Sequence, residues 1–355
     1  MEPSDPRSDR ERYAAQLGIS QAALDLYLAS EVIDLHIDSF IWHRVFGYDL
    51  TRKHGRGLLG GLCYSQADIP RVLKAGITGA TWVITTNPTR DARGREEVFY
   101  ENLHELVSIL ESVEQVQICK NAEDYRQARR AGKHAAYIGV QGGNALDRST
   151  TSLNGLASGL VLRITLVHLL TSSLGGTSSP GRFWGNPGLT SRGKQFVEQL
   201  DSLDIFVDLA HIDERGFWDA VSVHDKSKPL LVSHTGVSGV HQHWRNLDDR
   251  QLQAIANSGG VIGIMYHSKF LGDPLFSGSA ESIVRHMEHV VARVGPDHVA
   301  LGSDWDGAIC TPKDMRTCSE LPVLVDIMLR RGWPPDHIQK ALGLNFLRML
   351  EQLRG

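Results

Sequence analysis

Histidine and aspartate residues recur at the ends of apolar runs along this 355-residue chain. The residues in such positions are His36, Asp38, His168, His211, His234, His267 and Asp304. Imidazole nitrogens and carboxylate oxygens are ligands that zinc accepts in proteins. Side chains of this kind, repeated at strand ends, predict a metal-assisted active site at the mouth of an α/β barrel.

The clearest candidate ligands come in pairs. His36 and Asp38 lie on one side of an extended strand, because side chains alternate with a period of two. His211 and His234 end consecutive apolar runs, so neighbouring strands can bring both imidazoles to one ion. Each histidine alone is more often a hydrogen-bonded core residue. The metal site is predicted because the whole set occupies equivalent positions.

Asp304 stands in the segment GSDWDG, after the last apolar run. A carboxylate there can approach a metal-activated water and accept its proton as general base. The structural alternative is an aspartate that caps the following loop, a role that we assign to Asp306, two residues on.

The elements that position these residues alternate regularly. Eight buried strands are predicted at about 32–38, 77–86, 135–141, 160–168, 204–210, 229–235, 260–267 and 298–304. Amphipathic helices are predicted over 96–113, 190–203, 248–258 and 280–295, with Thr190 and Asp248 as N-cap candidates. The pattern predicts an α/β protein with a single (β/α)8 TIM-like barrel over 31–355, after an N-terminal extension and helix within 1–30. Two long loops, 42–66 and 171–188, follow strands 1 and 4 and can cover the site.

Composition excludes several classes of function. The net charge of −4 and the lack of a basic run give no support for nucleic-acid binding. No apolar stretch approaches the roughly 20 residues that span a membrane. The polar N-terminus lacks the apolar core that is typical of a signal peptide. No glycine-rich nucleotide motif follows a strand. We therefore expect a cytoplasmic protein that acts on a small molecule.

The four cysteines form no CxxC pair and no zinc-finger spacing. Free thiols in a reducing cytoplasm are the simplest interpretation of Cys63, Cys119, Cys310 and Cys318. A local disulfide between Cys310 and Cys318 is the alternative.

The order of the motifs resembles a known family. They are DLHID, QADIPRVLKAGITGA, YIGVQGGNALD, LRITLVH, GLTSRGKQFVEQLDSLDIFVDLAH, PLLVSHT, HWRNLDD, NSGGVIGI, DHVALGSDWDG and GLNFLRML. In this order and spacing, from about residue 31 to 350, the chain resembles the membrane (renal) dipeptidase family of zinc metallopeptidases, within the amidohydrolase-like barrels.

The resemblance implies a binuclear zinc site and a homodimer. One Zn²⁺ would be held by His36 and Asp38 and the other by His211 and His234, with a glutamate bridging both ions at the position of Gln141. Hydrolysis of an amide would then use metal-activated water.

Three further residues match functional positions of the family. His168 matches the histidine that holds or polarises the scissile amide, and Arg245 matches the arginine that receives the substrate carboxylate. Asp304 matches the catalytic acid/base. Outside this correspondence, His267 is a candidate additional ligand, proton carrier or substrate contact, with a satisfied polar residue as the alternative.

Gln141 departs from the family pattern. A glutamine is neutral and only its carbonyl oxygen can coordinate, so less charge screens two neighbouring dications from each other. We predict that at least one metal binds weakly or is absent. Asn144 also departs, since the family has histidine there, and we expect a change beside the site.

Three functions remain open on the sequence alone. In the first, the chain is a metal-dependent hydrolase of dipeptides or related small amides with one weakened metal site. In the second, it is a hydrolase of a different small-molecule amide in specialised metabolism. The third is a catalytically impaired homologue that binds a peptide-like ligand.

Overall fold

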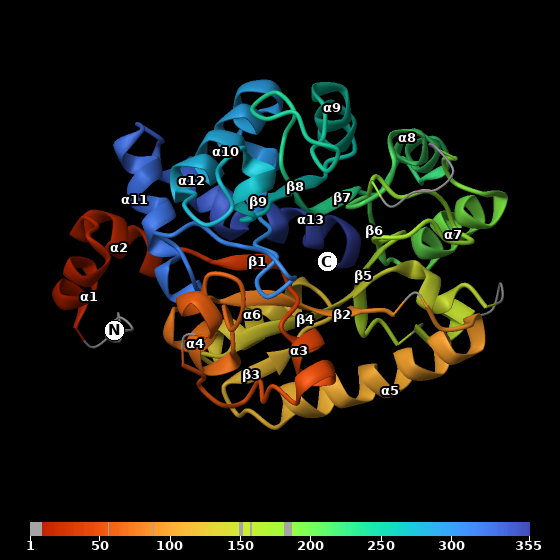
Figure 1. The fold of residues 1–355 in the computed structure, drawn as a ribbon, viewed down its shortest axis with the longest axis horizontal. Coiled ribbons are helices and arrows are strands. Elements are labelled where there is room, and N and C mark those ends of the chain that lie inside the picture. Colours follow the sequence, from red (N-terminus) through yellow and green to blue (C-terminus); the bar gives the residue numbers. More distant parts are fainter. Residues whose placement is uncertain (1–8, 56, 88, 149–151, 157, 181–186) are drawn as a thin grey trace.

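A closed parallel β-barrel forms the centre of the computed structural model, which describes residues 9–55, 57–87, 89–148, 152–156, 158–180 and 187–355 (Figure 1). The strands are β1 (Ile33–Ile37), β2 (Gly79–Thr85), β3 (Val116–Ile118), β4 (His134–Gln141), β5 (Val161–Thr165), β6 (Phe206–Asp208), β7 (Leu231–Thr235), β8 (Val261–Ile264) and β9 (Val299–Leu301). The pairing runs in the order β2-β1-β9-β8-β7-β6-β5-β4, and the β2–β4 pairing closes the ring. These eight strands are the eight that were predicted, and β3 adds an outer strand beside β4.

Helices surround the barrel (Figure 1). They are α1 (Arg10–Leu17), α2 (Gln21–Leu28), α3 (Phe40–Phe46), α4 (Ile69–Lys74), α5 (Ala92–Glu111), α6 (Ala122–Arg130), α7 (Ser191–Ser202), α8 (Glu214–Val223), α9 (Asp249–Asn257), α10 (Ala280–Val294), α11 (Pro322–Arg330), α12 (Pro335–Gln339) and α13 (Asn345–Arg354). The predicted N-caps form, because the side chains of Thr190 and Asp248 accept hydrogen bonds from backbone N–H groups of α7 and α9. At the N-terminus, α2 packs against α11, and α1 packs against α2 (Figure 1).

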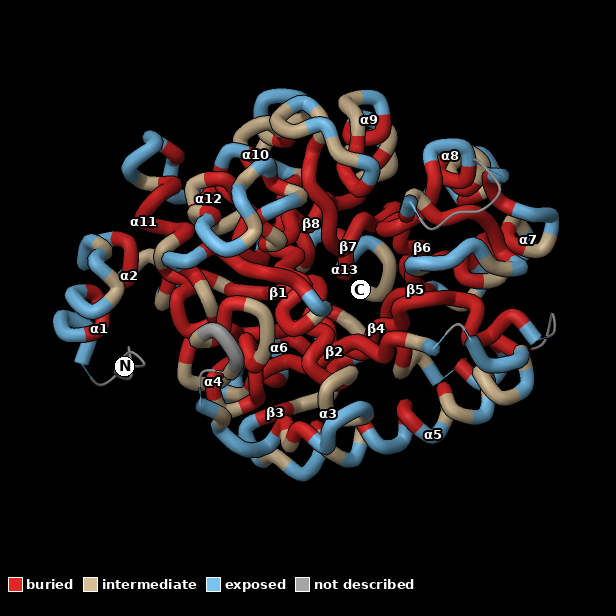
Figure 2. Tube along the Cα trace, in the orientation of Figure 1, coloured by how far each residue is buried: buried red, intermediate tan, exposed pale blue. Residues whose placement is uncertain are grey.

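The barrel strands are buried throughout, whereas exposed residues gather on the outer helices (Figure 2). Burial on both faces explains why the strands read as almost unbroken apolar runs. Phe346 and Met349 of α13 pack in one apolar cluster with Ile33, Phe206 and Leu231, which stand at or near the starts of three strands. This cluster fills the end of the barrel opposite the carboxyl ends of the strands, where active sites of this fold lie.

Two expectations about loops need adjustment. The stretch 42–66 is not irregular throughout, since it contains most of α3 and a 3-10 turn at Leu58–Gly61. Within the stretch 171–188, residues 181–186 lie outside the described residues, as do residues 1–8 of the predicted N-terminal extension. None of the helices in the described part of the chain is long and apolar enough to cross a bilayer.

The expectation of four free thiols is wrong. Cys63 and Cys310 form a disulfide that joins the loop after β1 to the loop after β9. Cys119 and Cys318 are free and buried, so the alternative Cys310–Cys318 pairing does not form either. The spacing could not reveal this bond because its partners are 247 positions apart. Such bonds persist in oxidising compartments, and the cytoplasmic location therefore stays a prediction.

Candidate active site

The carboxyl ends of the barrel strands meet at one cavity of about 260 Å³. Seven of the residues singled out in the sequence line it, namely Asp38, Gln141, His168, His211, Arg245, His267 and Asp304. The other two, His36 and His234, are fully buried with their rings 3.9 Å apart. The structure thus brings all nine predicted residues into one region.

The tightest group of candidate ligands spans both predicted pairs. One ligand atom from each of His36, His234 and Asp304 lies within 4.8 Å of the others. His36 Nε2 is 3.6 Å from Asp304 Oδ1, and His211 Nε2 is 2.9 Å from His234 Nε2. Two imidazole lone pairs this close repel each other unless a proton or a cation lies between them. The pair His211 and His234, with Asp304 nearby, therefore fits a divalent ion.

Backbone conformation supports a functional role for two of these residues. His211 and Asp304 have φ angles of 68° and 63°, in the left-handed region that non-glycine residues rarely adopt. Gly307 makes room for the Asp304 carboxylate, because a Cβ at Gly307 would lie 2.0 Å from Asp304 Oδ1. Unfavourable backbone geometry of this kind clusters at functional sites.

Burial in this site disfavours the charged forms of its carboxylate and imidazole side chains. Burial raises the pKa of Asp38 to about 7 and raises the pKa of Asp304 well above its ordinary value. Burial also lowers the pKa of His36, His211 and His234 well below the usual range, and nearby guanidinium groups lower it further. Neutral imidazoles beside poorly solvated carboxylates gain from a bound cation, as metal ligands do.

Gln141 ends β4 and is connected to Asp38 through Thr85. Thr85 Oγ1 donates to Asp38 Oδ1 at 2.5 Å, and Gln141 Nε2 donates to Thr85 Oγ1 at 3.4 Å. Gln141 Oε1 is buried and has no hydrogen-bond partner among the described residues. A buried oxygen without a partner costs free energy, so this carbonyl is available to an ion or a ligand.

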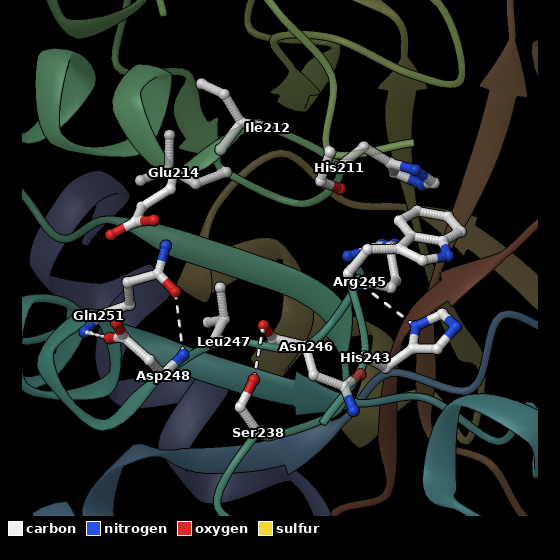
Figure 3. A pocket seen from close by; sticks show the side chains of 13 residues that line it. His211, Ile212, Glu214, Ser238, His243, Arg245, Asn246, Leu247, Asp248 and Gln251 are labelled. Carbon is white, nitrogen blue, oxygen red and sulfur yellow. Dashed lines mark hydrogen bonds between the residues drawn. The ribbon is translucent and has the colours of Figure 1, made fainter. Parts of the chain in front are cut away.

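Arg245 lines both this cavity and a second pocket of about 270 Å³ (Figure 3), as do His211 and Trp244. Arg245 Nη2 donates to the carbonyl oxygen of His234 at 2.7 Å, whereas the buried Nε has no partner in the described part of the chain. In Figure 3 the side chains of Arg245 and His211 lie on the same side of this second pocket. Burial lowers the pKa of Arg245 to about 10, which leaves the guanidinium charged at neutral pH.

His168 and His267 offer polar contacts at the cavity wall. The His168 ring stands edge-on to His211, with centroids 4.7 Å apart, and burial lowers its pKa to about 3. His267 Nδ1 lies 3.1 Å from the backbone nitrogen and 3.3 Å from the carbonyl oxygen of Cys310. The ring can therefore carry its proton on either nitrogen, and in the Nε2–H form it can act as a donor to a ligand in the cavity.

Asp306 and Asn144 lie close to these residues, and Asp306 has a different contact from the one predicted. Asp306 is structural, but it does not cap its own loop: its carboxylate accepts the backbone N–H groups of Gln66 and Ala67 and the hydroxyl of Ser39. Asn144 lies beside the site, where its side-chain oxygen accepts from Thr86 Oγ1 at 3.3 Å.

Sequence reasoning missed an apolar part of the cavity and a charged pair near it. The missed apolar lining residues are Ile41, Trp42, Leu169, Met265, Phe270 and Ile309. The charged pair is Arg163 and Asp208, joined at 2.8 Å. An arginine inside an apolar strand was a visible signal for this pair, whereas nothing in the sequence marked the apolar residues.

The chain resembles known proteins over most of its length. The profile of the membrane dipeptidase family (peptidase family M19) matches residues 20–354. An uncharacterized protein in the pqqA 5′ region of Klebsiella pneumoniae is 31% identical over 252 residues, which span 69% of this chain and 92% of that protein. Dipeptidase tcpJ of Claviceps purpurea is 28% identical over 240 residues, which span 68% of this chain and 56% of that protein.

Solved structures share the whole fold. The dipeptidase AC, a metallo peptidase of family M19, superposes with a TM-score of 0.82 and 25% identity over 92% of this chain and 99% of that one. A metallo peptidase from Rhodobacter sphaeroides, liganded with a phosphinate mimic of the dipeptide L-Ala-D-Ala, gives a TM-score of 0.80 at 24% identity. That superposition covers 91% of this chain and 99% of the other.

Proposed function

The chain belongs to the membrane dipeptidase family, and from that premise we propose that it cleaves dipeptides or closely related small amides. Membership makes it a metal-dependent hydrolase of the dipeptidase type. The proposal adds the substrate class, the roles of individual residues and a weakened metal site.

One observation carries the proposal: the candidate ligands Asp38, His211 and Asp304 line the same small cavity as a partly unpaired arginine, and His234 packs against His211. A volume of about 260 Å³ is at the lower end of ligand pockets and favours a dipeptide over a longer peptide. The apolar side chains of Ile41, Met265 and Ile309 favour a substrate with an apolar side chain.

Zinc is the ion that we propose, held by His211 and His234 with Asp304 nearby. When bound, such an ion acts as a Lewis acid that polarises a carbonyl group and makes water more acidic. Gln141 brings no charge to the cavity, so a second dication, typically about 3.5 Å from the first in two-metal sites, is poorly screened. We therefore propose that the second ion binds weakly.

The remaining roles follow from donor and acceptor chemistry. Arg245 holds the substrate carboxylate through the guanidinium N–H groups that the protein does not use. Asp304 takes up the proton of the attacking water and passes it to the leaving amine. His168 and His267 donate to the amide that is cleaved. A homodimer is part of the proposal on family grounds alone.

A different small-molecule amide is the second candidate substrate, and the largely apolar cavity wall is the observation that favours it. A ligand-binding homologue without catalysis is the third candidate, favoured by Gln141.

The test is hydrolysis of a dipeptide panel by protein purified without chelators, with zinc, manganese or cobalt added back. We expect release of free amino acids that requires metal and falls at least about 100-fold in Asp304→Asn, since general acid–base catalysis contributes about 10²–10⁴-fold. Dipeptide binding without turnover in metal-loaded protein would instead support the non-catalytic homologue.

A further inference from the structure

Arg163 of β5 is a buried guanidinium that contacts the back of the His36 ring. Its exposed fraction is 1%, and its Nη2 lies 2.8 Å from His36 Nδ1 and 3.1 Å from the carbonyl oxygen of Leu35. Its Nη1 donates to Asp208 Oδ2 at 2.8 Å and to Thr165 Oγ1 at 3.3 Å. Four contacts hold the guanidinium in one place.

A glycine in the neighbouring strand leaves space for the side chain of Arg163. A Cβ at Gly139 of β4 would lie 3.1 Å from Arg163 Cζ and 2.8 Å from the methyl group of Thr81. A larger residue at Gly139 would push the guanidinium away from His36. The position of Arg163 therefore depends on the strand beside it as well as on its own partners.

The contact with Arg163 decides which nitrogen of His36 carries a proton. A guanidinium has five N–H donors and no acceptor, so His36 Nδ1 must offer a lone pair to it. A neutral imidazole with a lone pair on Nδ1 has its proton on Nε2. The buried Nε2 of His36 is then a donor that faces Asp304 Oδ1 at 3.6 Å.

That arrangement is the reverse of what a metal ligand needs. A histidine that binds a metal through one nitrogen almost always donates the other N–H to an acceptor, which leaves a lone pair for the ion. His234 fits this rule, because its Nδ1 lies 2.8 Å from the hydroxyl of Ser233, which can accept. His211 is compatible with metal binding, because its buried Nδ1 has no partner among the described residues and so faces no donor. His36 does not fit the rule, because its outer partner can only donate.

We propose that Arg163 holds His36 in the Nε2–H tautomer, so that His36 presents an N–H group toward Asp304 instead of a lone pair, and the chain binds one divalent ion, at His211 and His234. Arg163 is a positioning residue, since it acts through His36. This inference rests on the proposed hydrolytic site, but it concerns the number of ions and the place of a proton, and neither requires turnover.

The first test is nitrogen NMR of the wild-type protein with ¹⁵N-labelled histidine, before and after addition of one equivalent of Zn²⁺. The signal lost in His36→Gln identifies His36. We expect His36 to show a protonated Nε2 in both states and His234 to show a metal-shifted Nε2 after zinc. An unprotonated or metal-shifted Nε2 at His36 would overturn the proposal.

The second test counts ions by mass spectrometry after removal of free metal. The wild type is expected to retain one zinc ion per chain, and so is Gln141→Glu. The double variant Arg163→Gln/Gln141→Glu is expected to retain two, because a neutral side chain at position 163 no longer requires a lone pair on His36 Nδ1, so that His36 Nε2 can bind the second ion.

Arg71→Gln is the matched control. Arg71 is also buried and paired with an aspartate, Asp68, at 3.5 Å, and its other contacts among the described residues go to the loop at 54–65 and not to a candidate ligand. Its variant is expected to keep one ion. Two ions in the wild type, or one ion in a folded double variant, would refute the proposal. If the double variant does not fold, the wild-type NMR result decides.

The two proposals can fail separately. One bound ion and a protonated Nε2 at His36, without hydrolysis of any dipeptide, would overturn the proposed substrate class and leave the role of Arg163 standing. Dipeptide hydrolysis by an enzyme with two tightly bound ions would overturn the proposed role of Arg163 and leave the proposed substrate class standing.

Discussion

Replacement of Arg245 by glutamine tests how the cavity selects its substrate. Arg245 is 3% exposed, and one of its terminal nitrogens is used by the His234 carbonyl. Its Nε is buried without a partner among the described residues, so the guanidinium keeps donors for an incoming carboxylate. Glutamine preserves an amide donor but removes the charge and the fork geometry.

The expected loss of kcat/KM in Arg245→Gln follows from the number of hydrogen bonds between Arg245 and the substrate carboxylate. A hydrogen bond to a charged group contributes about 1.5–3 kcal/mol, so two of them between Arg245 and a carboxylate contribute about 3–6 kcal/mol. At about 1.4 kcal/mol per factor of ten, kcat/KM for a dipeptide should fall by about 10²–10⁴-fold in Arg245→Gln.

The assay compares a dipeptide with its C-terminal amide, which has no carboxylate. The wild type should prefer the dipeptide by the same factor, and Arg245→Gln should lose that preference while its rate on the amide changes little. Arg250→Gln, at an exposed position of α9, is the control and should keep the preference. An equal loss on both substrates in Arg245→Gln would refute the carboxylate role, because it would place the effect in folding or in metal binding.

Three more predictions concern the metal, pH and the disulfide. Gln141→Glu should tighten binding of the single retained ion by at least about 10-fold, measured by competition with a chelator, since even residues outside the ligand set change metal affinity by about 10–100-fold. Burial lowers the pKa of His134 to about 4, so between pH 6.5 and pH 4 the unfolded chain binds a proton that the folded protein does not. The contribution of His134 to stability should be full above pH 6.5 and fall by about 3 kcal/mol toward pH 4. Urea denaturation of the wild type and of His134→Gln should show this difference in pH dependence. Alkylation of the denatured, unreduced protein should label two cysteines, and all four only after reduction; four labelled at once would contradict the Cys63–Cys310 bond.

The barrel could be predicted because local patterns dictate it. Each barrel strand is buried on both faces and therefore has a largely apolar sequence, as in the segment Val261–Ile264. Asp248 and Gln251 form a capping box at the start of α9, a signal that depends on residues three positions apart. Features fixed by neighbours in sequence, or by the repeat of strand and helix, were therefore predictable.

Features fixed by contacts across the barrel were not predictable from one sequence. Arg163 meets His36 from 127 positions away, and no periodicity links them. The same holds for the Cys63–Cys310 pairing. The types and positions of candidate ligands could thus be predicted, but the proton on His36 depends on a partner that only the fold supplies.

A count of charge in the cavity shows why one ion suits this site better than two. The charged side chains that line it in the described structure are Asp38, Asp304 and Arg245, which together carry one net negative charge when ionised. One divalent ion brings that total to +1, and a zwitterionic dipeptide leaves it there, whereas a second ion would raise it to +3. A glutamate at position 141 would reduce that excess to +2. Uncompensated buried charge costs several kcal/mol, so the neutral side chain of Gln141 and the single ion predicted from Arg163 and His36 are consequences of the same balance.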